Sequence, residues 1–315
     1  MSDFLIHHWA FSDSAVESYA VQNESPEILT GHWYHCHRDA DGLEEWLQEN
    51  KISNAAIGSL LARDTRPTFE LISENQWVLI LRGVNLNRDA SPEDMLSLRI
   101  LYFNGALISI RKTPSKTIQT LQTALESGEG PFDVGGILLT MMNGLNRNID
   151  DFLQGQEELI EAFDDESELT EEMMQTHKAL LKIKRFIKPQ QYALSDLYEA
   201  HLPELAQTQL HIKQSLNTIT RINETLDFYL GQLDIIKGEL RQYHAEKMNK
   251  NTYLFSVIAA VFLPTSFLTG LLGVNVGGIP GTTSALAFSI FCIALVFIFA
   301  LEIWILRRLR MFDKE

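Results

Sequence analysis

The chain has 315 residues, of which 41 are acidic and 26 basic, so its formal net charge is −15 at pH 7. Most of this excess lies in residues 1–251, which hold 38 Asp and Glu against 22 Lys and Arg. A surface of that sign repels phosphate backbones, which excludes nucleic-acid binding. The two cysteines, Cys36 and Cys292, are too few for a disulfide framework, in agreement with a reducing cytosol.

Residues 1–131 are predicted to form a cytosolic α/β domain. Asn104-Gly105 stands between two apolar runs and predicts a tight β-hairpin. The first eight residues lack a basic region followed by a long apolar run, so no cleaved signal peptide is expected. The β-rich runs are residues 31–36, 68–72, 77–84, 98–103 and 106–111. The expected helices are residues 43–49, 53–62 and 114–126.

Helical periodicity takes over from residue 132. Residues 132–203 are predicted to form two long paired helices, 132–168 and 171–201, with a kink or break at Pro189 and a boundary at Pro203. In residues 204–251, the cytosolic part of a long stalk helix, apolar side chains recur every seven positions. A lone helix cannot bury this seam, so we expect it to pack on the two preceding helices, on copies of itself, or on both. The seam consists of Leu205, Ile212, Ile219, Leu226, Leu233 and Leu240, with Leu216, Ile222, Tyr229, Ile236 and Tyr243 between them.

Two apolar segments, residues 252–272 and 285–306, are predicted to cross a membrane as helices. The first has no charged residue, and Glu302 is the only one in the second. A bilayer core about 30 Å thick needs ~20 helical residues, which both segments supply. Glu302 is close to Arg307, so pairing or snorkelling competes with a role in proton coupling.

Basic residues flank this apolar hairpin on one side only. Lys247 and Lys250 precede the first segment, and a basic tail, residues 307–315, follows the second. The connecting loop, residues 273–284, carries no charge. The positive-inside rule therefore places both chain ends in the cytosol.

One face of the first apolar segment carries mostly small or polar residues at spacings of three and four. Small residues allow membrane helices to pack closely, and in a symmetric ring of copies that packed face would line a pore. The stripe offers no ionisable ligand, so we expect a passing cation to remain hydrated. Asn275, just after the turn at Gly273, would accept hydrogen bonds from the water shell of a divalent ion. The stripe consists of Asn249, Thr252, Ser256, Ala259, Leu263, Ser266 and Gly270.

The end of this segment has a specific resemblance. Pro264-Thr265-Ser266-Phe267-Leu268-Thr269-Gly270, followed by Gly273-Val274-Asn275, resembles the signature of the CorA superfamily of divalent-cation transporters. The usual tripeptide of that family is Gly-Met-Asn, and magnesium-type members tend to carry acidic residues where this chain has the neutral residues 276–281. Both departures resemble the ZntB branch, which handles zinc, as do residues 81–87 and 92–99.

The resemblance implies a CorA-like funnel in the cytoplasmic (inner) membrane, built as a homopentamer. The α/β domain would form its rim, the long helix would line its axis, and the first spans would surround the pore. Gly273, Val274 and Asn275 would form the selectivity motif at the periplasmic entrance, with Asn275 holding the hydrated ion. The implied activity is proton-coupled uptake of Zn²⁺ or another divalent cation, without a cofactor, although export has also been proposed for the branch.

Other classes of function are compatible with the sequence. A magnesium or cobalt channel of the same superfamily is the first alternative, and a membrane-anchored coiled-coil sensor is the second. The chain contains no nucleophile triad, phosphate-binding loop or dinucleotide fingerprint, so an enzyme is not expected.

Two further clusters are candidate cation sites. Residues 32–37 combine three histidines with Cys36, and on a strand His35 and His37 share one face; ordinary strand residues near the rim are the alternative. Residues 157–172 contain nine acids and no base, which predicts a solvated helix end or, in five copies, a region that gathers cations. These acids are Glu157, Glu158, Glu161, Asp164, Asp165, Glu166, Glu168, Glu171 and Glu172.

Overall fold

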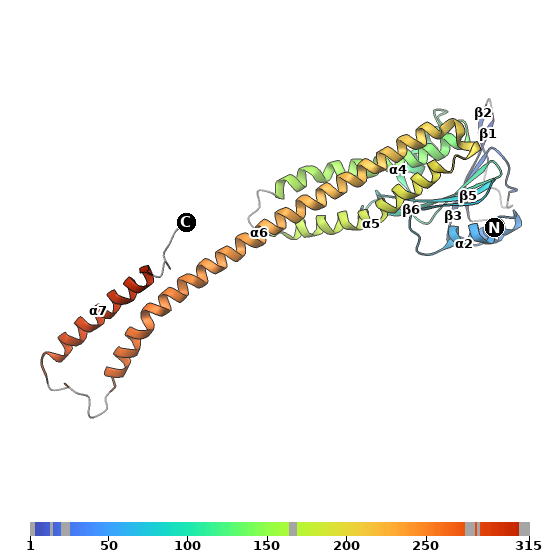
Figure 1. The fold of residues 1–315 in the computed structure, drawn as a ribbon. Coiled ribbons are helices and arrows are strands. Elements are labelled where there is room, and N and C mark those ends of the chain that lie inside the picture. Colours follow the sequence, from blue (N-terminus) through green and yellow to red (C-terminus); the bar gives the residue numbers. More distant parts are fainter. Residues whose placement is uncertain are drawn as a thin grey trace. The chain divides into compact units, whose positions relative to one another are not determined.

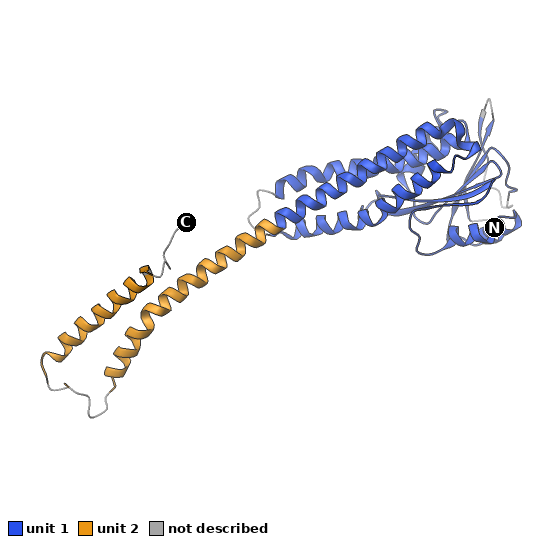
Figure 2. Cartoon of the chain, in the orientation of Figure 1, with its two compact units in different colours: residues 1–237 blue, residues 238–315 orange. Residues whose placement is uncertain are grey.

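The computed structural model describes residues 4–12, 15–19, 26–163, 169–274, 281 and 284–308. The chain divides into two compact units, residues 1–237 and residues 238–315 (Figure 2). The strands are β1 (Leu5–Ser12), β2 (Ala15–Ser18), β3 (His32–His37), β4 (Thr68–Ser73), β5 (Gln76–Gly83), β6 (Leu96–Phe103) and β7 (Ala106–Arg111). The helices are α1 (Leu43–Glu49), α2 (Asn54–Leu61), α3 (Lys116–Glu126), α4 (Val134–Ala162), α5 (Glu171–Glu199), the 3₁₀ helix η2 (Pro203–Thr208), α6 (Gln209–Leu272) and α7 (Ala287–Arg308).

The first unit is built on one seven-stranded sheet with the order β2-β1-β3-β7-β6-β5-β4. Every neighbouring pair is antiparallel except β3 and β7, which run parallel with Trp33 opposite Leu107. The predicted hairpin joins β6 to β7, because Asn104 and Gly105 both adopt positive φ angles of 47° and 83°. Those angles suit the two central residues of a two-residue turn that matches the sheet twist.

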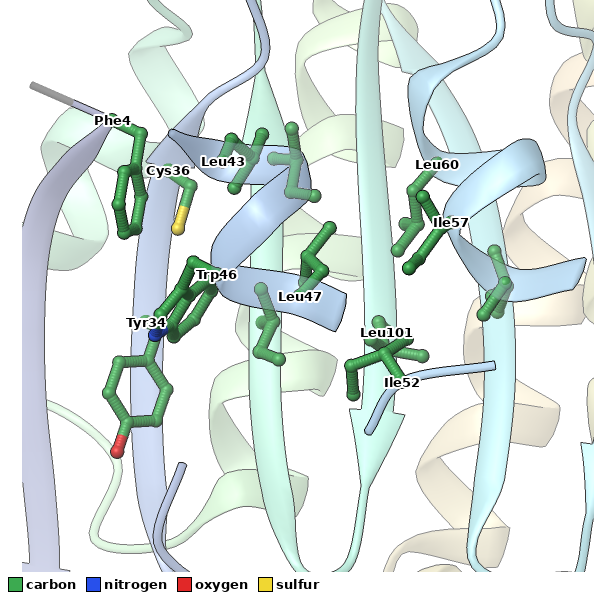
Figure 3. Close-up of a cluster of buried hydrophobic side chains, with 14 of the residues drawn as sticks. Phe4, Tyr34, Cys36, Leu43, Trp46, Leu47, Ile52, Ile57, Leu60 and Leu101 are labelled. Carbon is green, nitrogen blue, oxygen red and sulfur yellow. The ribbon is translucent and has the colours of Figure 1, made fainter. Parts of the chain in front are cut away.

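Helices cover both faces of the sheet (Figure 1). On one face, α1 and α2 enclose a hydrophobic core in which Trp46, Leu47 and Leu60 contact the alternate residues of the strands (Figure 3). Tyr34 and Cys36 of β3 belong to this core and are fully buried. The side chains of β5, β6 and β7 alternate between this core and the opposite face, which α4 and α5 cover.

Most of the heptad seam is buried within a single chain, although Tyr243 at its end is 53% exposed. Its members up to Ile236 are buried in the first unit, except Leu216, which is partly buried. The apolar faces of α4 and α5 lie in the same unit, with Ile149 and Ile183 among their fully buried residues. Hydrogen bonds join α6 to both helices: the Asn146 side chain donates to the Ser215 carbonyl at 3.1 Å, and Gln191 donates to Thr220 Oγ1 at 3.1 Å. The prediction that the seam packs on the two preceding helices is therefore confirmed.

Several predicted boundaries need correction. The helix predicted for residues 132–168 is the shorter α4, and the stalk helix starts at Gln209, after a 3₁₀ turn that begins at Pro203. Of the kink or break predicted at Pro189, the break does not occur, since α5 continues through this residue. The proline removes one backbone N–H, while Gln190 and Ile187 beside it remain buried. Strands β1 and β2 were not predicted.

The second unit contains the end of α6 and all of α7. Among the described residues, two helices are long and apolar enough to cross a membrane, and only 6% of each apolar window is buried within the single chain. Such surfaces are far more apolar than water-exposed helices tolerate, and they suit lipid or further copies of the chain.

Candidate functional site

The polar stripe forms a continuous exposed face on the apolar end of α6. All seven of its residues, from Asn249 to Gly270, are exposed in the single chain, and Leu263 is 74% exposed. Their spacing of three and four keeps them on one side of a helix with 3.6 residues per turn. The stripe is therefore left largely uncovered by the rest of the described chain.

The opposite side of the same helix carries the covered positions. Between residues 252 and 272, the buried or partly buried residues of α6 recur at spacings of one, three and four, and helix geometry places them roughly opposite the stripe. Helix α7 has its own covered stripe, which includes Leu295, Ile298 and Leu306. We take these two stripes as the faces on which the helices of the hairpin meet. The covered positions of α6 are Val257, Val261, Pro264, Thr265 and Leu268; their spacing can be read in the sequence, but they were not predicted as a contact face.

Hydroxyl side chains on α6 donate hydrogen bonds to backbone carbonyls of the same helix. Ser256 Oγ donates to the Thr252 carbonyl at 2.9 Å, and Thr269 Oγ1 donates to the Thr265 carbonyl at 3.0 Å. This bonding satisfies the donor in an apolar environment and leaves the oxygen lone pairs directed away from the backbone. On the stripe, Ser256 thus presents an acceptor, which suits the water shell of a cation.

Gly273 follows the last residue of α6 in a position that excludes a side chain. Its N–H donates to the Thr269 carbonyl at 2.9 Å, and a Cβ at this position would approach the same oxygen to 2.8 Å. A larger residue would force the end of the helix to open. Val274 is 49% exposed. Asn275, the third member of the predicted selectivity motif, lies outside the described residues.

Glu302 places a carboxyl group on the covered stripe of α7. The residue is partly buried, and its Oε2 atom has no hydrogen-bond partner among the residues that the structure describes. The side chain of Arg307, the partner suggested by the sequence, lies outside the described part. Ionisable side chains within an apolar span are rare and mark candidate functional positions.

The acidic window lies at the ends of two helices. Glu157, Glu158 and Glu161 are exposed near the end of α4, and Glu171 and Glu172 are exposed in the first turn of α5. Carboxylates are favourable at a helix N-terminus, which the second pair occupies, and unfavourable at a C-terminus. The window is thus open to solvent where it is described; Asp164, Asp165, Glu166 and Glu168 lie outside the described residues.

The histidine cluster of β3 does not have the geometry of a metal site. His35 is fully buried; its Nδ1 is 2.7 Å from Ser109 Oγ, and its Nε2 accepts a hydrogen bond from Arg111 Nε at 3.0 Å. Both ring nitrogens are therefore engaged. Burial, and then the charge of Arg111, hold the pKa of His35 well below its ordinary value.

The other members of that cluster point elsewhere. Cys36 faces the core beneath α1, where burial raises the pKa of its thiol, and His32 Nδ1 is 2.8 Å from His8 Nε2. Among the described residues, no group of three or more His, Cys, Asp or Glu side chains could hold a metal ion. The geometry thus argues against a metal site at His35 and His37.

Comparison with known proteins identifies the family. The family model described as "CorA-like Mg2+ transporter protein" matches residues 30–308. The chain belongs to the CorA-like transporter family. The zinc transport protein ZntB of Vibrio parahaemolyticus is 46% identical to this CorA-like chain over 312 residues, which is 99% of this chain and 98% of that protein.

Solved structures of the family share the fold. The crystal structure of the ZntB cytoplasmic domain from Vibrio parahaemolyticus matches with a TM-score of 0.73 and 42% identity, covering 77% of this chain and 99% of that one. The structure of full-length CmaX matches with a TM-score of 0.83 and 26% identity, covering 98% and 99% of the two chains. The predicted fold, an N-terminal α/β domain with a long helix and two apolar C-terminal helices, is therefore confirmed.

Proposed function

We propose that this protein transports zinc across the cytoplasmic membrane through a pore on the axis of a homopentamer. The observation that carries the proposal is the exposure of the polar stripe, which lies opposite the covered positions of α6. A ring of copies of α6 would bury this stripe at its centre, while α7 would lie outside the ring. The 46% identity to a zinc transport protein supports zinc as the ion.

The proposed path carries a hydrated ion. Ser256 and the other small or polar members of the stripe offer acceptor oxygens and space rather than charged ligands, and Leu263 forms an apolar constriction. Asn275 is proposed as the first site for the hydrated ion at the periplasmic entrance, with Gly273 and Val274 holding it there. In this arrangement both termini are cytosolic, and the exposed acids of residues 157–172 raise the local cation concentration.

We further propose that uptake is coupled to protons, with Glu302 as the candidate coupling group. Glu302 is the only charged residue of the second apolar segment, and acids within membrane spans commonly take part in proton relays. Glu302→Gln should leave assembly unchanged and make zinc flux insensitive to a pH gradient. Flux that still follows the gradient in this variant would rule out Glu302 as the coupling group.

Purified protein in liposomes tests the whole proposal. Zinc, magnesium and cobalt uptake are measured with and without an imposed pH gradient, and the subunit number is measured by native mass spectrometry. Asn275→Ala should abolish transport without changing assembly, whereas Asn54→Ala, at an exposed position on α2, should have no effect. Flux of magnesium but not zinc would favour the family's magnesium activity instead. Normal zinc flux in Asn275→Ala would contradict the proposed selectivity site.

A further inference from the structure

A cavity of about 220 Å³ in the first unit has six basic residues among the thirteen that line it. It lies where β3, β5 and β7 end and β6 begins, since Arg38 follows β3, Lys112 follows β7, and Arg82 is paired with Ser97. Of the lining residues that the structure describes, Asp94 is the only acid. The basic lining residues, here called the basic cavity, are Arg38, Arg63, Arg82, Arg99, Arg111 and Lys112. In a chain with a net charge of −15, this concentration of positive charge needs an explanation.

Carboxylates neutralise only part of the basic cavity. Asp39, beside it, accepts from Arg38 at 2.5 Å and lies 3.1 Å from Lys112 Nζ. Asp94 is 3.4 Å from Lys182, outside the cavity lining. Arg38 and Lys112 therefore share the single carboxylate of Asp39. Asp94, the one acid of the lining, pairs with Lys182 instead of a basic residue of the cavity.

The two innermost guanidinium groups bond to neutral acceptors. Arg82 donates to the carbonyls of Met95 at 3.0 Å and Thr65 at 2.7 Å. Arg99, which is 1% exposed, donates to the Leu60 carbonyl. Carbonyl groups fix the orientation of a guanidinium without neutralising it. Asp64 near Arg82 and Asp39 near Arg99 offset part of these charges from outside the lining. A desolvated charge is expensive unless it is fully paired.

The guanidinium groups of Arg82 and Arg99 each have one N–H donor that makes no hydrogen bond to the described residues. Arg99 Nη2 and Arg82 Nε are buried, and neither has a hydrogen-bond partner among the described residues. Burial, followed by the charges of Arg38 and Arg82, lowers the pKa of Arg99 to about 10, so the group remains protonated at neutral pH. An enclosed, protonated guanidinium with an unused N–H marks a place where an acceptor with negative charge would be stabilised.

We infer that the basic cavity binds a phosphate-type oxyanion, either free or as the phosphoryl end of a larger molecule. Guanidinium groups match the oxygens of phosphate with paired, charge-assisted hydrogen bonds. A water molecule occupies about 30 Å³ in the liquid, so the cavity has room for one phosphoryl group with a few waters but not for a whole nucleotide. The same charges exclude the transported divalent cation, so this site is distinct from the ion pathway.

The test measures binding of inorganic phosphate to the full chain in metal-free detergent solution by isothermal titration calorimetry. We expect one saturable site per chain, with binding weakened by added salt. Arg63 is exposed at the mouth of the cavity, so Arg63→Gln should weaken binding about fivefold without disturbing the fold, as expected for one solvent-exposed charge. Arg88→Gln is the matched control, because the Arg88 side chain is 97% exposed and is not part of the lining.

A second variant and a second ligand complete the test. Arg99→Met should remove the increase in melting temperature that phosphate produces, whatever it does to the melting temperature without phosphate. Adenosine monophosphate that binds more tightly than phosphate, while adenosine does not bind, would identify the phosphoryl end of a larger molecule as the ligand. The absence of saturable binding in millimolar phosphate, or equal weakening by Arg63→Gln and Arg88→Gln, would overturn the inference.

Discussion

Replacing His35 by alanine tests whether this histidine stabilises the fold or binds zinc. The side chain is fully buried between β1 and β7, and it contacts Ser109 Oγ at 2.7 Å and Arg111 Nε at 3.0 Å. Removing it leaves the Arg111 donor without its acceptor and the Ser109 hydroxyl with only the bond from Trp33 Nε1 at 2.8 Å. Each buried polar group left unsatisfied costs ~1–3 kcal/mol, and neighbouring losses are not additive, so we expect a loss of about 3 kcal/mol in the free energy of unfolding.

This loss is measured by unfolding the full chain in urea, with circular dichroism as the probe of unfolding. Zinc uptake is measured in parallel in liposomes and expressed per folded protein. We expect zinc uptake to be unchanged in His35→Ala. His37→Ala is the control, because His37 is only partly buried at the end of β3, and it should cost less than about 1 kcal/mol.

Two results would refute the reasoning. If His35→Ala unfolds at the same urea concentration as the parent protein, the hydrogen bonds of His35 contribute no stability. If stability is unchanged and zinc uptake is lost in both variants, the two histidines take part in zinc handling, as their spacing in the sequence had suggested.

Three other predictions concern stability and transport. Burial and the neighbouring His32 lower the pKa of His8 to about 4, so the folded state holds this ring neutral while the unfolded chain protonates it below pH 6.5. The free energy of unfolding should therefore fall as the pH drops from 6.5 to 4, by at most about 1.4 kcal/mol per pH unit for this group, and urea titrations of His8→Phe should show a shallower slope. Gly105→Ala should lower stability by about 1–2 kcal/mol in thermal melts, because φ is +83° and the new Cβ would lie 2.5 Å from Thr30 Cγ2; an unchanged melting temperature would count against this turn geometry. Ala259→Phe on the stripe should block zinc flux, whereas Ala294→Phe on the exposed side of α7 should not, and equal effects of the two variants would contradict a pore lined by the stripe.

Much of the fold could be predicted from local signals. The β6–β7 hairpin follows from Asn104-Gly105, whose backbone adopts the positive φ angles that such a turn requires. Helix α1 was predicted with its observed ends, because Gly42 precedes it and Leu43, Trp46 and Leu47 form one apolar side. In these places, local conformational preference and the final packing favour the same structure.

Other features depend on contacts that no local pattern contains. Strand β1 pairs with β2 and β3, and its burial does not alternate regularly, because a register shift lies between Leu5 and His7. Pro189 predicted a kink or a break, yet α5 is continuous through it, with Ile187 and Gln190 buried on either side. Packing on a neighbouring helix here outweighs the loss of one backbone hydrogen bond.

The polar stripe and the basic cavity also differ in how far the sequence alone could predict them. The stripe on α6 is visible in the sequence because its residues share one helix and a regular spacing. The members of the basic cavity are spread from Arg38 to Lys112 over several strands and loops, and the sheet order alone brings them together. The sequence has no motif that could have identified this cavity.

The burial of the heptad seam within one chain has a consequence for biosynthesis. Helices α4 and α5 are complete at residue 199, but the surface that covers their apolar faces continues to Ile236 of α6. At ~5–20 residues per second, the ribosome needs about 2–7 s to add that stretch, and during this time the two helices expose side chains prone to aggregation. The first apolar span follows shortly afterwards, so the nascent chain closes its soluble core just as its membrane segment is being made.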